Sequence, residues 1–177
     1  RIDTDILYDN MMNKFAWGGA NDERANIDYH HRRTLIVIRA RLNYARLSKA
    51  LAAEGKNELA TGVLDHCMEM LPLDRIPYDP YVTDIIEAYF ADGEKDKAVE
   101  MSKDLSDYYY GQLDYYFKQT PYIVRSAEYE IQSAIQYTYR TAGVCGDNGM
   151  KELAEEMNAK VEDYYGRYIQ LQTPAEN

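Results

Sequence analysis

Apolar and small residues recur at helical spacing on both sides of Gly55, and this pattern organises the middle of the chain. On the N-terminal side they are Tyr44, Leu47, Ser48 and Leu51, and on the C-terminal side they are Leu59, Ala60, Val63, Leu64, Cys67, Met68 and Leu71. Intervals of three and four residues place each set on one face of an amphipathic helix. Gly55 suits the left-handed conformation that ends the first helix, and Pro72 closes the second. The stretch from Tyr44 to Pro72 therefore predicts a helical hairpin.

This hairpin resembles a tetratricopeptide repeat in the places where its small residues fall. Ser48 and Ala60 stand where neighbouring helix backbones approach closely in such a repeat, so larger side chains there would overpack the contact. The same spacing recurs farther along the chain, where Ala98 follows Gly93 at the interval at which Ala60 follows Gly55. The residues expected to shape the hairpins are Ser48, Gly55, Ala60, Pro72, Gly93 and Ala98.

Helical periodicity also predicts elements on the N-terminal side of this hairpin. Residues 4–15 are expected to form a short helix with Thr4 as its N-cap. A loop over 16–28 follows, because glycine and polar residues dominate it. One long helix is then predicted from 29 to 54, and it supplies the first half of the hairpin.

A second hairpin is predicted over 79–110, after a linker that contains several prolines. Gly93 and Glu94 form its turn, and the run beyond Tyr110 can continue as a frayed or offset helix as far as Pro121. Pro121 itself suits the first turn of a new helix, for which Thr120 is the expected N-cap.

A third hairpin is predicted at the C-terminal end of the chain. It pairs a helix over 121–142 with another over 149–171, because apolar residues keep a helical period in both. The glycine-containing stretch 142–149 is expected to be a loop between them, with Asn148 as the N-cap of the last helix.

No segment alternates as a strand does, so the predicted fold class is all-α. We predict a right-handed, tetratricopeptide-like α-solenoid of about three stacked hairpins plus an N-terminal helix. It forms a single domain over 1–171, and residues 172–177 are expected to be a disordered tail. The hairpins cover approximately 29–72, 79–110 and 121–171.

The charge balance limits the classes of partner. Asp plus Glu number 30 against 20 Lys plus Arg, for a formal net charge of −10. A nucleic-acid partner is disfavoured, because phosphate binding needs positive charge. No apolar run is long enough to predict a transmembrane segment. The chain begins Arg1-Ile2-Asp3, without an initiator Met or a signal peptide, so we expect it to be part of a longer protein.

Basic residues gather in the predicted helix over 29–54, where no acidic residue intervenes. They are Arg32, Arg33, Arg39, Arg41, Arg46 and Lys49. One interpretation, which we favour, is contact with acidic side chains of the following helices, because the basic residues do not share one helix face. The alternative is a stripe that faces anions or phospholipids.

Tyrosine is over-represented, with 18 Tyr against 3 Phe and 1 Trp. The interpretation we favour is packing with the hydroxyl at the wet edge of the helices, and the alternative is an aromatic surface for sugar or peptide. Trp17 is expected to close one end of the helix stack. The clustered tyrosines are Tyr108, Tyr109, Tyr110, Tyr115, Tyr116, Tyr164, Tyr165 and Tyr168.

No arrangement of residues predicts a catalytic, cofactor-binding or metal site. Cys67 and Cys145 do not define a disulfide framework or a metal site. His30 and His31 are adjacent, whereas helical zinc pairs stand four residues apart. No serine lies in a nucleophile-elbow context, and without strands no glycine loop can follow one to hold phosphate.

Four segments follow one another in a distinctive order: LYDNMMNKFAWGGAND, RRTLIVIRARLNYARLSKALAAEGK, ATGVLDHCMEMLP and IPYDPYVTDIIEAYFADGEKDKA. Their order resembles a Bacteroidetes-type family of multi-pass membrane proteins of unknown function, whose membrane part is similar to protein O-mannosyltransferases. The resemblance covers most of residues 1–171. It implies an extramembrane C-terminal domain on the periplasmic side of the inner membrane, with any transferase chemistry in a membrane part that this chain lacks.

Three functions are consistent with this pattern. The first is a non-catalytic module that binds a protein or peptide, or its own missing membrane domain, in a concave groove. The second is a carbohydrate-binding accessory domain that uses Trp17 and the tyrosine clusters, and the third is a cap that only stabilises the membrane part. The groove-facing candidates are Arg46, Lys49, Asp84, Glu87 and Phe90.

Overall fold

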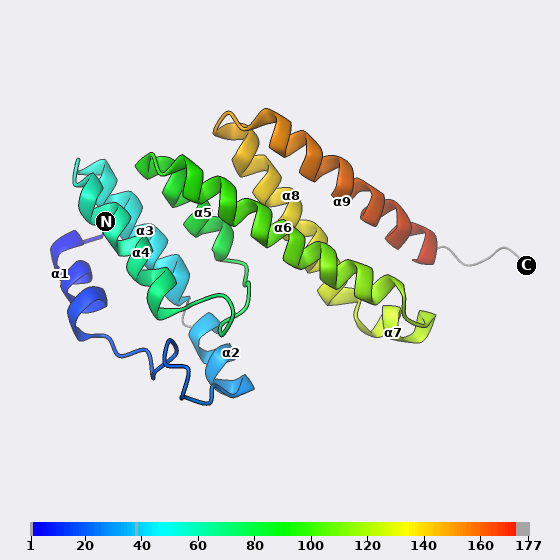
Figure 1. Cartoon of the computed structure of the whole chain (residues 1–177), viewed down its shortest axis with the longest axis horizontal. Coiled ribbons are helices and arrows are strands. Elements are labelled where there is room, and N and C mark those ends of the chain that lie inside the picture. Colours follow the sequence, from blue (N-terminus) through cyan, green and yellow to red (C-terminus); the bar gives the residue numbers. More distant parts are fainter. Residues whose placement is uncertain (1, 38, 173–177) are drawn as a thin grey trace, which may run out of the picture. The chain divides into compact units, whose positions relative to one another are not determined.

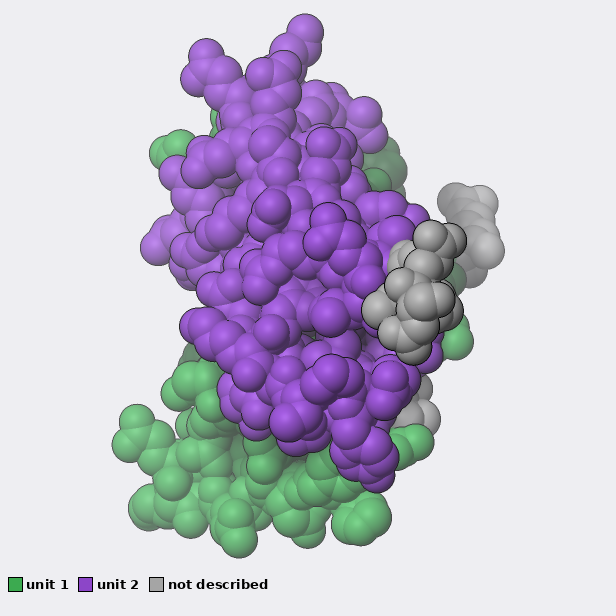
Figure 2. All heavy atoms as spheres, turned by 90° about the vertical axis from the view of Figure 1, so that its right-hand side faces the viewer, with its two compact units in different colours: residues 1–98 green, residues 99–177 purple. Residues whose placement is uncertain are grey.

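Helices form the regular secondary structure of the described residues, 2–37 and 39–172 of a computed structural model, and no strand occurs among them (Figure 1). The all-α prediction is confirmed. The chain divides into two compact units, residues 1–98 and 99–177, which Figure 2 distinguishes by colour. The prediction of a single domain over 1–171 stays a prediction. The predicted disordered tail falls, from residue 173 onward, outside the described residues.

The first helix is shorter than predicted. α1 (Thr4–Asp9) passes into a π-helical turn, η1 (Asn10–Lys14), in which the Phe15 amide donates to the Asn10 carbonyl at 2.8 Å. The N-cap is Asp3, whose carboxylate accepts from the Ile6 amide, so the prediction of Thr4 as the cap is wrong. The Thr4 hydroxyl donates instead to Glu54, in the turn that follows α3.

The long helix predicted over 29–54 is interrupted, so that prediction is wrong. It forms as α2 (Tyr29–Val37) and α3 (Ala40–Ala53). Arg39 lies between them with φ = 56°, a left-handed conformation that is uncommon for a residue other than glycine. That conformation cannot continue an α-helix, so α3 starts afresh and places Arg41 in its first turn.

The hairpin around Gly55 forms from α3 and α4 (Asn57–Met70), which pack on each other. Gly55 has φ = 77°, and the Lys56 amide donates to the Leu51 carbonyl at 3.0 Å. Ser48 and Ala60 are fully buried, as the close approach of helices requires. Pro72 follows the end of α4, and its carbonyl accepts from the Ile76 amide in the linker to the next helix.

α5 (Val82–Asp92) ends at Gly93, which has φ = 88°, and α6 (Lys95–Phe117) follows at once. The Glu94 amide donates back to the Tyr89 carbonyl at 2.9 Å and so closes the end of α5. Ala98, in the first turn of α6, is fully buried. The predicted continuation of the helix beyond Tyr110 is present, because α6 extends to Phe117 and Leu113 is buried on its apolar face.

In residues 99–177, α7 (Pro121–Ser126) follows Thr120, which occupies the N-cap position. A break at Ala127 separates α7 from α8 (Glu128–Asp147), so the predicted helix over 121–142 is both divided and too short. The loop predicted over 142–149 is wrong for most of its length, because α8 continues to Asp147 and buries Ala142 and Cys145.

The turn between the last two helices is correspondingly short. α9 (Lys151–Gln172) packs against α8 as an antiparallel hairpin (Figure 1). Asn148 does not cap α9 as predicted. It ends α8, and its side-chain amide donates to the Val144 carbonyl at 2.8 Å. Gly149, with φ = 82°, then supplies the left-handed residue that reverses the chain.

Candidate functional site

The predicted groove residues lie on two helices that pack against each other, α3 and α5. Arg46 and Lys49 are three residues apart on α3, and Asp84 and Glu87 are three apart on α5, so each pair shares a helix face. Lys49 Nζ lies 2.8 Å from Glu87 Oε2. Arg46 is exposed, whereas the other candidates, Phe90 included, are half-buried. We call this surface the α3–α5 face, defined by Arg46, Lys49, Asp84, Glu87 and Phe90.

A second polar link joins the same two helices. The buried Ser48 hydroxyl donates to Asp92 Oδ2 at 2.8 Å. Burial raises the pKa of Asp92, the hydrogen bond from Ser48 lowers it, and the nearby charge of Glu94 raises it further. The seam between α3 and α5 therefore holds a carboxylate that is partly removed from water, in addition to the ion pair of Lys49 with Glu87.

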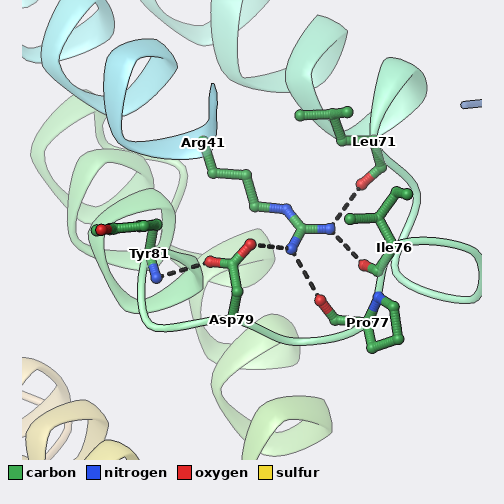
Figure 3. A network of polar contacts seen from close by, with 6 residues as sticks. All are labelled: Arg41, Leu71, Ile76, Pro77, Asp79 and Tyr81. Atoms are coloured by element: carbon green, nitrogen blue, oxygen red, sulfur yellow. Dashed lines mark hydrogen bonds and ion pairs between the residues drawn. The ribbon is translucent and has the colours of Figure 1, made fainter. Parts of the chain in front are cut away.

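The most buried charge among the described residues of the first unit is the guanidinium of Arg41, which the sequence marked only as one of six basic residues. Arg41 and Asp79 expose only 1% and 4% of their side chains, and Arg41 Nη1 lies 2.6 Å from Asp79 Oδ2 (Figure 3). Nη1 also donates to the Pro77 carbonyl, and Nη2 donates to the carbonyls of Leu71 and Ile76, at 2.6 to 3.0 Å. The other oxygen of Asp79 accepts from the Tyr81 amide at 2.7 Å.

This network holds the irregular segment between α4 and α5 against α3. Carbonyls outside helices need donors when they are buried, and one guanidinium supplies several in a fixed plane. A signal was present in the sequence: Arg41 stands three residues before Tyr44, on the apolar face of α3. Arg41 and Lys49 both contact acids on later elements, as the interpretation of the basic residues that we favoured expects.

Trp17 packs inside an aromatic cluster and offers little free surface. Its ring centroid lies 5.8 Å from that of Phe15 and 5.7 Å from that of Tyr44, and its indole nitrogen is buried. Such offset and edge-on contacts are typical of aromatic cores. Trp17 is thus poorly placed to stack on a sugar.

Two predicted tyrosines of residues 99–177 pack between α6 and α9. The rings of Tyr110 and Tyr164 stack with centroids 5.6 Å apart. Tyr110 donates to the Met157 carbonyl at 3.1 Å, and Tyr164 donates to Asp114 at 2.8 Å. Burial is the main cause that raises the pKa of each phenol to about 12. These contacts match the packing role that we favoured for the tyrosines.

Two more of the predicted tyrosines, Tyr165 and Tyr168, lie at a depression between α8 and α9 of about 480 Å³. Tyr168 is buried, whereas 48% of Tyr165 is exposed. Residues from both helices line the depression, among them Gln132, Gln136 and Tyr139 of α8 and Tyr165, Tyr168 and Ile169 of α9. We call it the α8–α9 depression.

The thiols are unsuited to nucleophilic chemistry. Cys67 and Cys145 are buried and unpaired with each other. Burial raises the pKa of Cys67 to about 12 and also raises the pKa of Cys145. The thiolate is the reactive form, so both cysteines are inert near neutral pH.

Within residues 2–37 and 39–172, no cluster of three or more His, Cys, Asp or Glu side chains is arranged to hold a metal ion. No helix in those ranges is both long and apolar enough to cross a bilayer. Comparisons with protein-family models, with curated proteins and with solved structures gave no match.

Proposed function

We propose that this chain is a non-catalytic interaction module of the tetratricopeptide type, in which the α3–α5 face binds an extended segment of a partner protein. One observation carries the proposal: α3 and α5 pack side by side and bring Lys49 within 2.8 Å of Glu87. In stacked helical hairpins, such adjoining helices line an extended binding surface.

The side chains of the α3–α5 face suit a segment that carries charge and one apolar anchor. Arg46 is exposed and can pair with a carboxylate through two parallel hydrogen bonds. The ion pair of Lys49 with Glu87 is partly exposed and so contributes at most about 1 kcal/mol, which lets a partner's charges replace either member. Phe90 is half-buried and provides apolar area for the anchor.

An array of peptides with systematically varied charge and aromatic content tests this function. The full chain is applied to the array, and the dissociation constants of the tightest peptides are measured by fluorescence anisotropy. We expect Arg46→Ala and Glu87→Ala each to weaken binding about tenfold, which corresponds to loss of one good polar contact. Lys95→Ala and Glu69→Ala are matched controls, since both residues are exposed and lie outside the α3–α5 face. If Arg46→Ala and Lys95→Ala bind the peptides with equal affinity, the α3–α5 face is not the binding surface.

We further propose that the chain is the extramembrane part of a membrane-anchored, glycosyltransferase-like protein and faces the periplasm. The support is the order of segments described above, from LYDNMMNKFAWGGAND through the arginine-rich helix to the two hairpins. Sequencing the complete gene tests this placement, since it should reveal spanning helices ahead of Arg1. A complete reading frame that encodes no spanning helix would overturn it.

A further inference from the structure

The α8–α9 depression has the size and the make-up of a small-molecule site. Its volume of about 480 Å³ falls within the range of roughly 300–1,000 Å³ that is usual for such sites. Three phenols and the apolar side chains of Ile135 and Ile169 supply most of the wall, and two glutamine amides supply the polar groups. Among the described residues, none of the side chains that line the depression is formally charged.

The polar groups at one edge are held in place before any ligand arrives. Gln132 Nε2 donates to the Tyr168 hydroxyl at 2.7 Å and to Glu128 Oε1 at 3.2 Å, and the Tyr168 hydroxyl donates to Glu128 at 2.9 Å. Because both N–H groups of Gln132 are used in this way, the group that it presents is its carbonyl oxygen, an acceptor. Gln136 lies one helical turn farther along α8 and adds a second, exposed amide.

An aromatic surface stands beside these amides. Tyr165 is 48% exposed, whereas Tyr168, three residues farther along the same helix, is 6% exposed and is fixed by its hydrogen bonds. One ring is therefore available as a platform and the other helps to form the wall. A ligand that suits both groups needs an apolar face and, around its rim, several uncharged hydroxyls.

We propose that the α8–α9 depression binds a neutral pyranose sugar. The C–H face of the ring would stack on Tyr165, and its hydroxyls would bond to the carbonyl of Gln132 and to the amide of Gln136. An anionic ligand is disfavoured, because the lining offers no positive charge to offset its desolvation and the Glu128 carboxylate is bonded to two lining residues, Gln132 and Tyr168. This proposal does not rest on the function of the α3–α5 face, since the depression lies in residues 99–177 and that face in residues 1–98.

The test uses the full chain and a panel of neutral disaccharides: maltose, cellobiose, mannobiose and chitobiose. Binding is followed by saturation-transfer NMR and by calorimetry, and glucuronic acid and glucosamine serve as charged counterparts. We expect saturable, millimolar binding of at least one neutral sugar. Tyr165→Ala and Gln136→Ala should each weaken it about tenfold, whereas Tyr165→Phe, which keeps the ring, should retain most of the affinity.

The matched control is Tyr122→Ala on α7, which removes a ring that is 74% exposed and does not line the depression. Circular dichroism of each variant verifies that the fold is retained, as we expect for substitutions at exposed positions. The proposal is overturned if no neutral sugar binds at about 10 mM, or if Tyr165→Ala binds as well as Tyr122→Ala. Preference for a charged counterpart, or binding of a proline-rich peptide at Tyr165 when no sugar binds, would also overturn it.

Discussion

Residues 1–98 and residues 99–177 are both helical, but different polar groups hold their elements together. In the first unit, guanidinium groups reach into irregular backbone: Arg41 binds the segment from Leu71 to Asp79, and Arg75 donates to the carbonyls of Ala20 and Ala25. In the second unit, helices meet through tyrosine hydroxyls and stacked rings, with charges at the wet edge.

The difference follows from how the chain connects its helices. α4 and α5 are joined by a segment of eleven residues, 71–81, in which the carbonyls of Leu71, Ile76 and Pro77 accept from Arg41. Buried carbonyls of this kind need donors, and arginine offers the most in one side chain. α8 and α9 are joined by a tight turn, so nearly all nearby carbonyls are already bonded within helices and a tyrosine suffices at the contact. The energetic importance of single residues should therefore differ between the units.

The largest expected effect is at Arg41. Arg41→Met should lower the free energy of unfolding by about 3–5 kcal/mol, because it leaves Asp79 charged and buried and also strips several carbonyls of a donor. Urea denaturation followed by circular dichroism measures the change. Arg33→Met is the control, since Arg33 is exposed. A loss below about 1 kcal/mol for Arg41→Met would show that the network is not a main support of residues 1–98.

Overpacking a close helix contact should lower the free energy of unfolding by less than Arg41→Met does, and by a similar amount in both units. Ala60 and Ala134 are both fully buried, one in each unit. Ala60→Leu and Ala134→Leu should each destabilise the protein by about 1–3 kcal/mol, measured by urea denaturation. Ala53→Leu, at an exposed position on α3, is the control and should change stability little. If only one of the two core variants is destabilised, close helix contact is not a shared feature of the units.

The local part of the fold could be predicted from sequence, and the parts that depend on tertiary contact could not. The hairpin around Gly55 was predictable, because periodicity, a left-handed glycine and a closing proline agree. The break at Arg39 was not, since arginine is a good helix former and carries no signal for a left-handed turn. The loop predicted over 142–149 failed for the opposite reason: its glycines suggested a loop, but burial of Ala142 and Cys145 sustains the helix.

The candidate sites also differ in how far local sequence patterns predict them. Helical spacing put Lys49 and Glu87 on corresponding faces, and the structure places them 2.8 Å apart. The Arg41 network depends on where a proline-containing linker folds, which no local pattern specifies. Only part of the α8–α9 depression could be predicted. Tyr165 belongs to a tyrosine cluster in the sequence, whereas Gln132 has no local signal and joins the lining only because α8 packs against α9.

Removal of one tyrosine hydroxyl tests how much a tyrosine hydrogen bond contributes to the stability of the second unit. Tyr164→Phe keeps the ring that stacks on Tyr110 and deletes the hydrogen bond to Asp114. The expected loss in the free energy of unfolding is about 0.5–1.5 kcal/mol, well below that for Arg41→Met, because Asp114 stays partly hydrated. Tyr115→Phe, at an exposed position, is the control in the same urea denaturation. A loss as large as that of Arg41→Met would erase the contrast between the units.

The smallest expected effect is a pH dependence at Asp92 in the α3–α5 seam. Burial raises its pKa above the ordinary value of 3.8, so the folded protein favours the protonated carboxyl. The resulting stabilisation is fully present below pH 3.8 and is lost as the pH rises through the raised pKa. Asp92→Asn cannot ionise and escapes this loss. Its stability relative to the unmodified chain should therefore increase with pH across the acidic range and then stay constant.

Thermal unfolding in buffers of graded acidity measures that difference, with the exposed Asp74→Asn as control. The Ser48 hydroxyl opposes the shift, because it hydrogen-bonds the ionised carboxylate. Ser48→Ala removes this hydrogen bond. It should therefore increase the difference in stability between the protein with Asp and the protein with Asn at position 92. A relative stability of Asp92→Asn that falls as the pH rises would mean that Asp92 is stabilised in its charged form. The α3–α5 seam would then depend on a charged group, as the Arg41 network does.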